Sequence, residues 1–176
     1  MKSWIAALLL ALPLAAWAHG PTPQKAEETV EINAAPAAVW AKIKDFGAIA
    51  SWQPALEKVA AEGGNGNGAK RTLTFKSGGV LEEELDDYSD AEMRYAYRMG
   101  RDMDIKALPV SSLNGRLEVT AGKDGKTVVT WKARFYRAFT GNEPPAGQDD
   151  ATAVEGVTAY FRQGLDNLKQ LVESGK

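Results

Sequence analysis

The sequence predicts an α+β fold in which a curved antiparallel sheet wraps around one long C-terminal helix. Apolar and polar residues alternate with a period of two in successive segments up to residue 137, which is the pattern of half-buried strands. From residue 151 the apolar residues instead recur every three or four positions, as on one face of an amphipathic helix. Strands followed by a separate helix indicate the α+β class, and the space between such a sheet and its helix can hold a ligand.

Seven segments have strand character, and tight turns separate several of them. The run GGNGNG at 63–68 and the pair Asp124-Gly125 consist of residues that tolerate the positive φ of such turns. The predicted strands are 28–33, 56–61, 70–76, 80–88, 93–99, 113–119 and 127–137.

Two segments have helical periodicity. A short helix is predicted at 36–46, because Pro36 suits a first helical turn and Gly47 ends the apolar repeat; one more turn is expected at 48–52. The long helix begins at 151, with Asp149 or Asp150 as its N-cap. Its apolar stripe consists of Val154, Val157, Phe161, Leu165, Leu168 and Val172.

The N-terminus is typical of a secretory signal peptide. Lys2 supplies a positive charge, residues 4–16 carry no charge, and Ala16-Trp17-Ala18 has the small-x-small pattern of a cleavage site. The apolar stretch is shorter than the roughly 20 residues of a transmembrane helix. We therefore expect a signal peptide at 1–18, an N-terminal arm at 19–26, and one soluble domain without a membrane span at 27–176.

Composition excludes several kinds of chemistry. The chain has 21 Lys and Arg against 23 Asp and Glu, a formal net charge of −2, which gives no electrostatic reason to expect nucleic acid as a partner. It has no Cys, so thiol chemistry and Cys-based metal sites are excluded. His19 is the only His, so a two-histidine copper site and a Ser-His-Asp triad are excluded as well. We expect neither a metal nor a cofactor.

Aromatic residues, together with one Met and one carboxylate, are expected on the inner face. Glu83 shares its strand parity with Leu81 and Leu85, so it is expected to point inward, where burial would raise its pKa and suit general acid catalysis. A solvated strand edge is the other interpretation of the acidic run around it. The ligand-pocket candidates are Trp52, Phe75, Glu83, Tyr95, Tyr97, Met99, Trp131, Phe135 and Tyr160. Core packing alone is the competing explanation for the aromatic residues, and Gly164 permits either close packing or ligand space.

The segment 140–150, rich in Pro and Gly, is longer than a turn requires, as is common for binding loops. Alternation in the strand before it places Arg134 and Tyr136 outward and Arg137 inward. The partner-docking candidates are Arg134, Tyr136, Arg137, Thr140, Asn142, Glu143, Pro144 and Pro145. A simple bridge from strand to helix is the alternative role for this segment.

Several short motifs resemble the START/Bet v 1-like (SRPBCC) superfamily, including its polyketide cyclase/dehydrase-like families. The resemblance lies in the long C-terminal helix and in TVEI at 29–32, AP at 35–36, VW at 39–40, DF at 45–46 and WQP at 52–54. It implies the helix-grip fold over the whole chain after the signal peptide. These motifs mark the fold and say little about chemistry.

The chain also resembles a narrower family, the MxaD type of periplasmic accessory protein in bacterial methanol oxidation. The similar segments are HGPTPQK at 19–25, DFGAIASW at 45–52, ALPVSS at 107–112, RFYR at 134–137 with TGNEPP at 140–145, and FRQGL at 161–165. The resemblance implies a periplasmic helper in electron transfer from a quinone-dependent methanol dehydrogenase to its c-type cytochrome. Relatives often carry His where this chain has Gln53, so no role of an imidazole is carried over.

Three functions therefore remain open at this point. The leading hypothesis is a non-enzymatic accessory protein that contacts the dehydrogenase, the cytochrome or both. The second is a periplasmic carrier of a small hydrophobic ligand. The third is a cyclase- or hydrolase-like enzyme of the same fold that uses Glu83 or another buried carboxylate.

Overall fold

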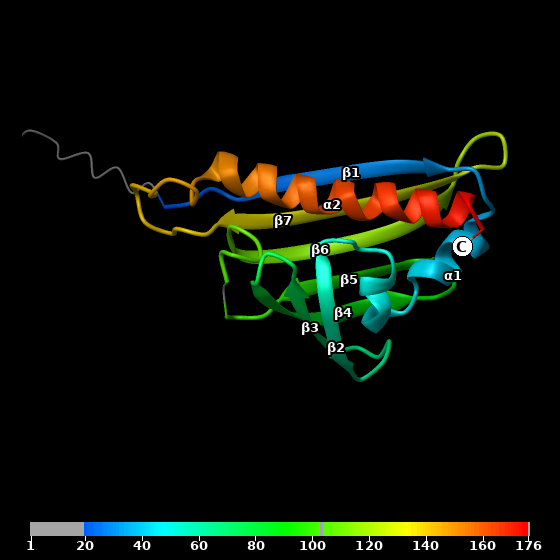
Figure 1. Cartoon of the computed structure of the whole chain (residues 1–176), viewed down its shortest axis with the longest axis horizontal. Coiled ribbons are helices and arrows are strands. Elements are labelled where there is room, and N and C mark those ends of the chain that lie inside the picture. Colours follow the sequence, from blue (N-terminus) through cyan, green and yellow to red (C-terminus); the bar gives the residue numbers. More distant parts are fainter. Residues whose placement is uncertain (1–19, 103, 176) are drawn as a thin grey trace, which may run out of the picture.

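A computed structural model describes residues 20–102 and 104–175, which form a seven-stranded antiparallel sheet and three helices (Figure 1). The strand order is β1-β7-β6-β5-β4-β3-β2. The elements are β1 (Gln24–Ile32), α1 (Pro36–Ile43), the 3₁₀-helix η1 (Phe46–Ser51), β2 (Leu56–Glu62), β3 (Lys70–Phe75), β4 (Val80–Ser89), β5 (Arg94–Met99), β6 (Val110–Ala121), β7 (Thr127–Arg137) and α2 (Asp150–Glu173). The predicted signal peptide at 1–18 lies outside the described residues.

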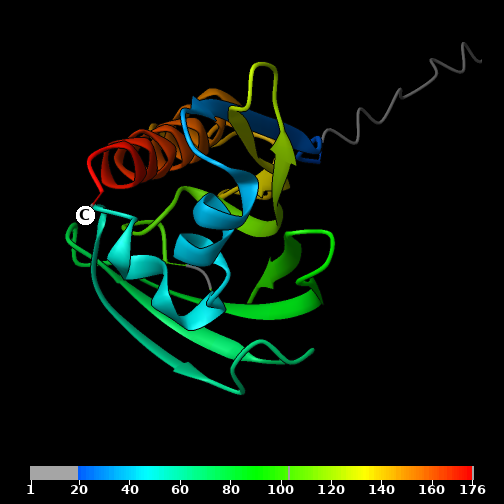
Figure 2. The same cartoon turned by 90° about the vertical axis from the view of Figure 1, so that its right-hand side faces the viewer.

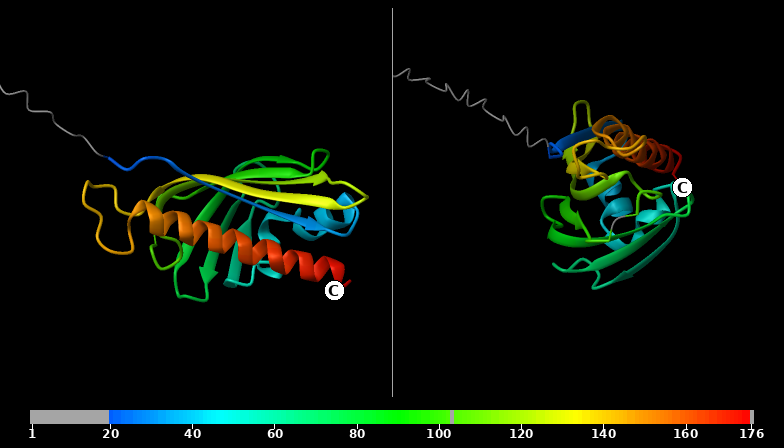
Figure 3. Two further views of the ribbon diagram at one scale, coloured as in Figure 1. Left: turned by 90° about the horizontal axis from the view of Figure 1, so that it is seen from above. Right: turned by 90° about the vertical axis from the view of Figure 1, so that its left-hand side faces the viewer.

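The sheet curves around the long helix, as the sequence predicts. α2 runs alongside β1 and β7, and the sheet then bends away so that β2, β3 and β4 form a second wall (Figure 2). The small helices α1 and η1 close the space near the C-terminal end of α2, whereas the 138–149 loop lies at its other end (Figure 3). This is the helix-grip arrangement. Within 20–102 and 104–175, no helix is long and apolar enough to cross a bilayer.

The first strand begins earlier than expected. Gln24, Lys25 and Ala26, expected in the N-terminal arm, belong to β1 and pair with Phe135, Arg134 and Ala133 of β7. Pro21 and Pro23 disfavour regular pairing only up to residue 23, and the long β7 offers hydrogen-bonding groups to every residue beyond. The part of the arm before Gln24 has no regular secondary structure where it is described.

The predicted helix at 36–46 is divided into α1 and η1. Asp45 has an extended backbone that interrupts the helix, and its Oδ1 accepts a hydrogen bond of 2.9 Å from the Gly47 N–H. Asp149 acts in the same way for α2, as one of the two predicted N-caps, because its carboxylate accepts a 2.7 Å hydrogen bond from the Thr152 N–H. Both helix starts are therefore set by the local sequence.

Two glycines permit close packing inside the fold. A Cβ at Gly164 of α2 would lie 2.5 Å from Nε2 of Gln53 and 3.0 Å from the Trp131 ring. Gln53 is fully buried, and this Nε2 donates a 2.9 Å hydrogen bond to the Tyr160 carbonyl. A Cβ at Gly115 of β6 would lie 2.3 Å from the ring of Tyr97 on β5. Of the two roles considered for Gly164, the structure therefore shows close packing.

We predict that Gly164→Ala destabilises the protein by about 1 kcal/mol in urea unfolding. The gain in helix propensity, about 1 kcal/mol, opposes an overpacking cost of about 1–3 kcal/mol. In a Gln53→Ala background, Gly164→Ala should lower the free energy of unfolding by less. The coupling energy between the two substitutions should be at least about 0.5 kcal/mol. Strictly additive effects of the two substitutions would contradict the proposed contact.

Candidate functional site

All nine ligand-pocket candidates lie in the interior, between the concave face of the sheet and the helices. None of them is more than 8% exposed. They come from β3, β4, β5, β7, α2 and the turn after η1, so the tertiary structure assembles them from most of the chain. Alternation along the strands correctly placed the strand members on the inner face. Their role as a ligand pocket remains a prediction.

Aromatic rings beneath α2 pack on one another around Trp131. The ring of Trp131 stacks on that of Phe161, with centroids 4.2 Å apart, and contacts Trp52 and Tyr160 at 5.3 and 5.4 Å. Nε1 of Trp131 donates a 2.9 Å hydrogen bond to Oη of Tyr97. These contacts occupy much of the space between the sheet and α2.

A second cluster, beneath η1, contains a buried ion pair. Arg71 of β3 and Glu83 of β4 are only 1% and 4% exposed. Nε of Arg71 donates a 2.6 Å hydrogen bond to Oε2 of Glu83, and Nη2 lies 2.6 Å from the same oxygen. Nη1 donates to the Phe46 carbonyl at 2.7 Å, and the guanidinium lies 3.9 Å from the centre of the Phe46 ring and 5.1 Å from that of Tyr97. The cation is thus bound by a carboxylate, a carbonyl and two aromatic faces.

Burial and ion pairing shift the pKa values of Arg71 and Glu83 in opposite directions. Burial raises the pKa of Glu83, and the positive charge and hydrogen bond of Arg71 counteract that rise. For Arg71, burial alone would lower the pKa, but the Glu83 carboxylate raises it overall, so the guanidinium stays charged. Burial also raises the pKa of Tyr97 and Tyr160 well above the usual range, so both phenols are neutral.

Sequence reasoning found Glu83 but missed its partner. Arg71 has the same strand parity as Leu73 and Phe75, so alternation already predicts an inward-pointing cation on one strand. Glu83 is the corresponding inward anion on another strand. The register, in which Arg71 pairs with Glu83 across β3 and β4, brings the two together.

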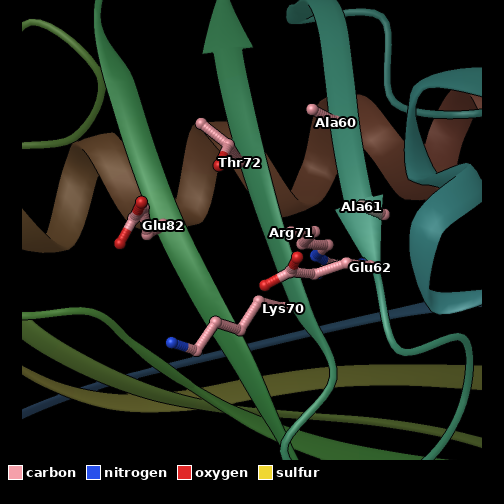
Figure 4. Close-up of a pocket in the computed structure, with 7 residues that line it drawn as sticks. All are labelled: Ala60, Ala61, Glu62, Lys70, Arg71, Thr72 and Glu82. Atoms are coloured by element: carbon pink, nitrogen blue, oxygen red, sulfur yellow. The ribbon is translucent and has the colours of Figure 1, made fainter.

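The residues that alternate with the buried ones on these strands lie on the outer side of the sheet. A shallow hollow of about 260 Å³ lies over β2, β3 and β4. Figure 4 shows Lys70, Thr72 and Glu82 on the near side of the strands, with α2 behind the sheet. Arg71 lies between Lys70 and Thr72 in sequence and is buried on the opposite side. The hollow therefore lies on the outer side of the sheet, and the Arg71 side chain pairs with Glu83 on the inner side.

A groove opens at the edge of the interior, between α2 and the 107–109 segment. It measures about 440 Å³ and reaches the rings of Phe75 and Tyr160, whose centroids are 5.3 Å apart. Oη of Tyr160 and Nε1 of Trp52 are buried and have no hydrogen-bond partner among residues 20–102 and 104–175. A groove of this size between apolar side chains suits a small hydrophobic molecule.

The docking candidates divide into two groups. Arg134 and Tyr136 point outward, as alternation predicts, and most of the 140–145 segment is exposed. Arg137 is only 8% exposed, which confirms its predicted inward orientation and removes it from the surface candidates. Its guanidinium donates to the Phe139 and Gly141 carbonyls at 2.8 and 2.7 Å and to Asp150 at 3.1 Å. Because its strand position faces inward, Arg137 holds the loop against α2 and is not part of an exposed docking face.

We predict that Glu83→Ala destabilises the fold by about 3–5 kcal/mol, since it leaves the Arg71 cation buried without its carboxylate. The double variant Arg71→Met/Glu83→Leu should recover most of that loss, because it removes both charges and keeps apolar volume. Urea unfolding of both variants measures the difference. A loss below about 1 kcal/mol in Glu83→Ala would show that the pair does not stabilise the core.

Comparison with known proteins agrees with this architecture. Residues 23–173 match the family described as polyketide cyclase / dehydrase and lipid transport. No curated protein sequence matches the chain significantly. Within the part of the chain that the structure describes, no group of three or more His, Asp or Glu side chains is placed to hold a metal ion.

Solved structures of the same fold are similar over most of the chain. The protein XoxI from Bacillus cereus is 23% identical with a TM-score of 0.70, over 84% of this chain and 94% of its own. The Zhui aromatase/cyclase from a Streptomyces species is 19% identical with a TM-score of 0.67, over 86% and 94%. Ara h 8.0201 is 17% identical with a TM-score of 0.66, over 87% and 99%. At these identities the similarity shows the fold alone. The chain belongs to the polyketide cyclase/dehydrase and lipid transport family, and thus to the START/Bet v 1-like (SRPBCC) superfamily.

Proposed function

We propose that this protein is a periplasmic, non-enzymatic accessory protein of methanol oxidation. In this role it binds quinone-dependent methanol dehydrogenase, its c-type cytochrome or both, and assists their interaction or electron transfer. The proposal rests on the expected export signal and on the resemblance of five sequence segments to the MxaD type of accessory protein.

The observation that carries the proposal is how two of those segments meet in space. Residues 107–112 and 134–145 are distant in sequence, yet Ser112 pairs with Tyr136 across β6 and β7, and the Ala138 N–H donates a 3.0 Å hydrogen bond to the Pro109 carbonyl. Pro109 also packs against Gly156 of α2. These two of the five segments therefore form one continuous region at the end of the sheet, as expected if a partner recognises them together.

The interior supports a binding role over acid catalysis. Glu83 is the carboxylate considered for a general acid, and it is enclosed and bound by Arg71. A general acid must reach its substrate within hydrogen-bond distance. Because Glu83 is paired with Arg71, the proposal assigns function to the surface.

The proposal is tested with purified mature protein, methanol dehydrogenase and the c-type cytochrome. We expect direct binding to at least one of them at low salt, and faster reduction of the cytochrome by the dehydrogenase when the protein is added. Binding to neither partner, with an unchanged rate of electron transfer, would contradict the proposal. Bovine serum albumin at the same concentration controls for nonspecific protein effects.

We predict that Arg134→Ala/Tyr136→Ala weakens partner binding by about tenfold or more, since outward Arg and Tyr are common interface hot spots. Lys58→Ala/Lys70→Ala, on the far edge of the sheet, is the control and should bind as the unmodified protein does. Both pairs are tested by biolayer interferometry after circular dichroism confirms folding. Equal binding by the two double variants would place the docking face elsewhere.

A second candidate function is a carrier of a small hydrophobic ligand, favoured by the groove beside Phe75 and Tyr160. Its volume of about 440 Å³ lies within the usual range of about 300–1,000 Å³ for ligand sites. Native mass spectrometry of gently purified protein should then show an additional bound mass. Ala159→Trp, which fills the groove, should remove this mass, whereas Ala151→Trp, one turn or more away on α2, should retain it. A bare polypeptide mass for the unmodified protein would contradict the carrier role.

A further inference from the structure

The strands β1, β7 and β6 lie side by side in the sheet (Figure 1). Four basic side chains gather on the convex face of these strands. They are Lys25, Arg116, Lys132 and Arg134, and we refer to them as the basic saddle. Arg134 lies opposite Lys25 on one side, and Lys132 lies opposite Arg116 on the other. All four have outward strand parity, and Lys25, Lys132 and Arg134 are exposed.

The saddle surrounds a hollow of about 340 Å³. Beneath it runs a row of small residues, Ala26, Ala133 and Gly115, which are paired across the three strands and face the interior. The hollow is therefore bounded by backbone below and by long cationic side chains around its rim. Asn114 and Glu27 complete the rim.

The cations of the saddle are unpaired, in contrast to those nearby on the same face. On β5, Arg94 pairs with Asp87 and Glu92, and Arg98 pairs with Glu84 and Asp86. Within 20–102 and 104–175, none of the four saddle cations forms an ion pair. Nε of Arg116 is also buried without a hydrogen-bond partner in that part of the chain.

This concentration of charge is unexpected in a chain with a net charge of −2. Like charges directly opposite each other on neighbouring strands destabilise a sheet, and the saddle contains two such pairs. Among the residues that line the hollow, one is acidic: Glu27, which lies opposite Lys132 without forming an ion pair. An arrangement that costs stability and leaves donors unsatisfied is typical of a surface that a ligand completes.

We propose that the basic saddle docks an acidic surface of a partner protein. The inference deepens the proposed function by naming the face and the charge of the partner, and its identification with the dehydrogenase or cytochrome rests on that proposed function. Tyr136 lies two residues beyond Arg134 on the same face and is 38% exposed, so an aromatic contact adjoins the charges, as in protein interfaces.

The observations favour a protein over a phosphate polymer or a membrane. Nucleic acid binding uses a longer basic stripe or groove that follows the backbone, whereas the saddle is compact and has Glu27 beside it. Membrane surfaces are bound with the help of exposed large apolar side chains. Of the large apolar residues that are exposed in the described chain, namely Val80, Ile105, Tyr136 and Phe139, only Tyr136 adjoins the saddle.

The test uses charge reversal with a matched control. Lys132→Glu/Arg134→Glu reverses two saddle charges, and Lys58→Glu/Lys70→Glu makes the same change in net charge on β2 and β3, at the far edge of the sheet. The probes are polyglutamate, a double-stranded DNA oligomer, phosphatidylglycerol vesicles, and the purified dehydrogenase and cytochrome. Circular dichroism and thermal unfolding establish that both variants are folded.

We expect polyglutamate to bind the unmodified protein and the control, with an affinity that falls as salt rises. The saddle variant should lose at least tenfold in affinity for polyglutamate and for the acidic partner. Equal losses in both variants, or none in the saddle variant, would overturn the inference. DNA or vesicle binding that exceeds polyglutamate binding and depends on the saddle would overturn the assignment to a protein.

The same measurements separate this inference from the proposed function. If the saddle binds polyglutamate but neither the dehydrogenase nor the cytochrome binds, the proposed function fails and the acidic docking face stands. If the dehydrogenase or cytochrome binds the saddle variant as well as the unmodified protein, the proposed function stands and the inference fails.

Discussion

Arg71 enters the core from β3 and is bound there by one carboxylate, one carbonyl and two aromatic rings. Through Glu83 it links β3 to β4, and through Phe46 it links the sheet to η1. A buried cation must be paired, because an uncompensated charge in the core costs several kcal/mol. The pair therefore constrains the register of the two strands and the position of η1, which packs against the adjacent edge strand β2.

Aromatic side chains connect this ion pair to the rest of the interior. Tyr97 covers one side of the guanidinium and accepts a hydrogen bond from Trp131, whose ring stacks on Phe161 of α2. A continuous series of contacts thus connects the ion pair to the long helix. Gly115 and Gly164 provide the room for Tyr97 and for Gln53, respectively. Aromatic side chains pack on one another between the sheet and α2, and a groove lies at the edge of this space, beside Phe75 and Tyr160.

Membership of the family establishes the architecture, and one architecture supports many functions. The function proposed here depends on the surface: the region where 107–112 meets 134–145, and the basic saddle on the convex face. Both include β6 and β7, and Arg134 belongs to each. Arg137 contributes indirectly, because its hydrogen bonds to Phe139, Gly141 and Asp150 hold the 138–149 loop at the end of the sheet.

The sequence by itself determined most of the secondary structure and the direction in which strand residues point, because both depend on local periodicity. The early start of β1 and the break between α1 and η1 were not predicted. Alternation placed Tyr95, Trp131 and Glu83 inside and Arg134 outside, and Asp149 marked the start of α2. The tertiary structure alone decided which of these residues meet. Arg71 and Glu83 are joined by the register of β3 and β4, and Lys25 reaches Arg134 only because the first and last strands pair. The β1–β7 pairing joins strands that are distant in sequence, and no local pattern encodes it. The β3–β4 pairing is within one hairpin, but which residues face each other depends on its register.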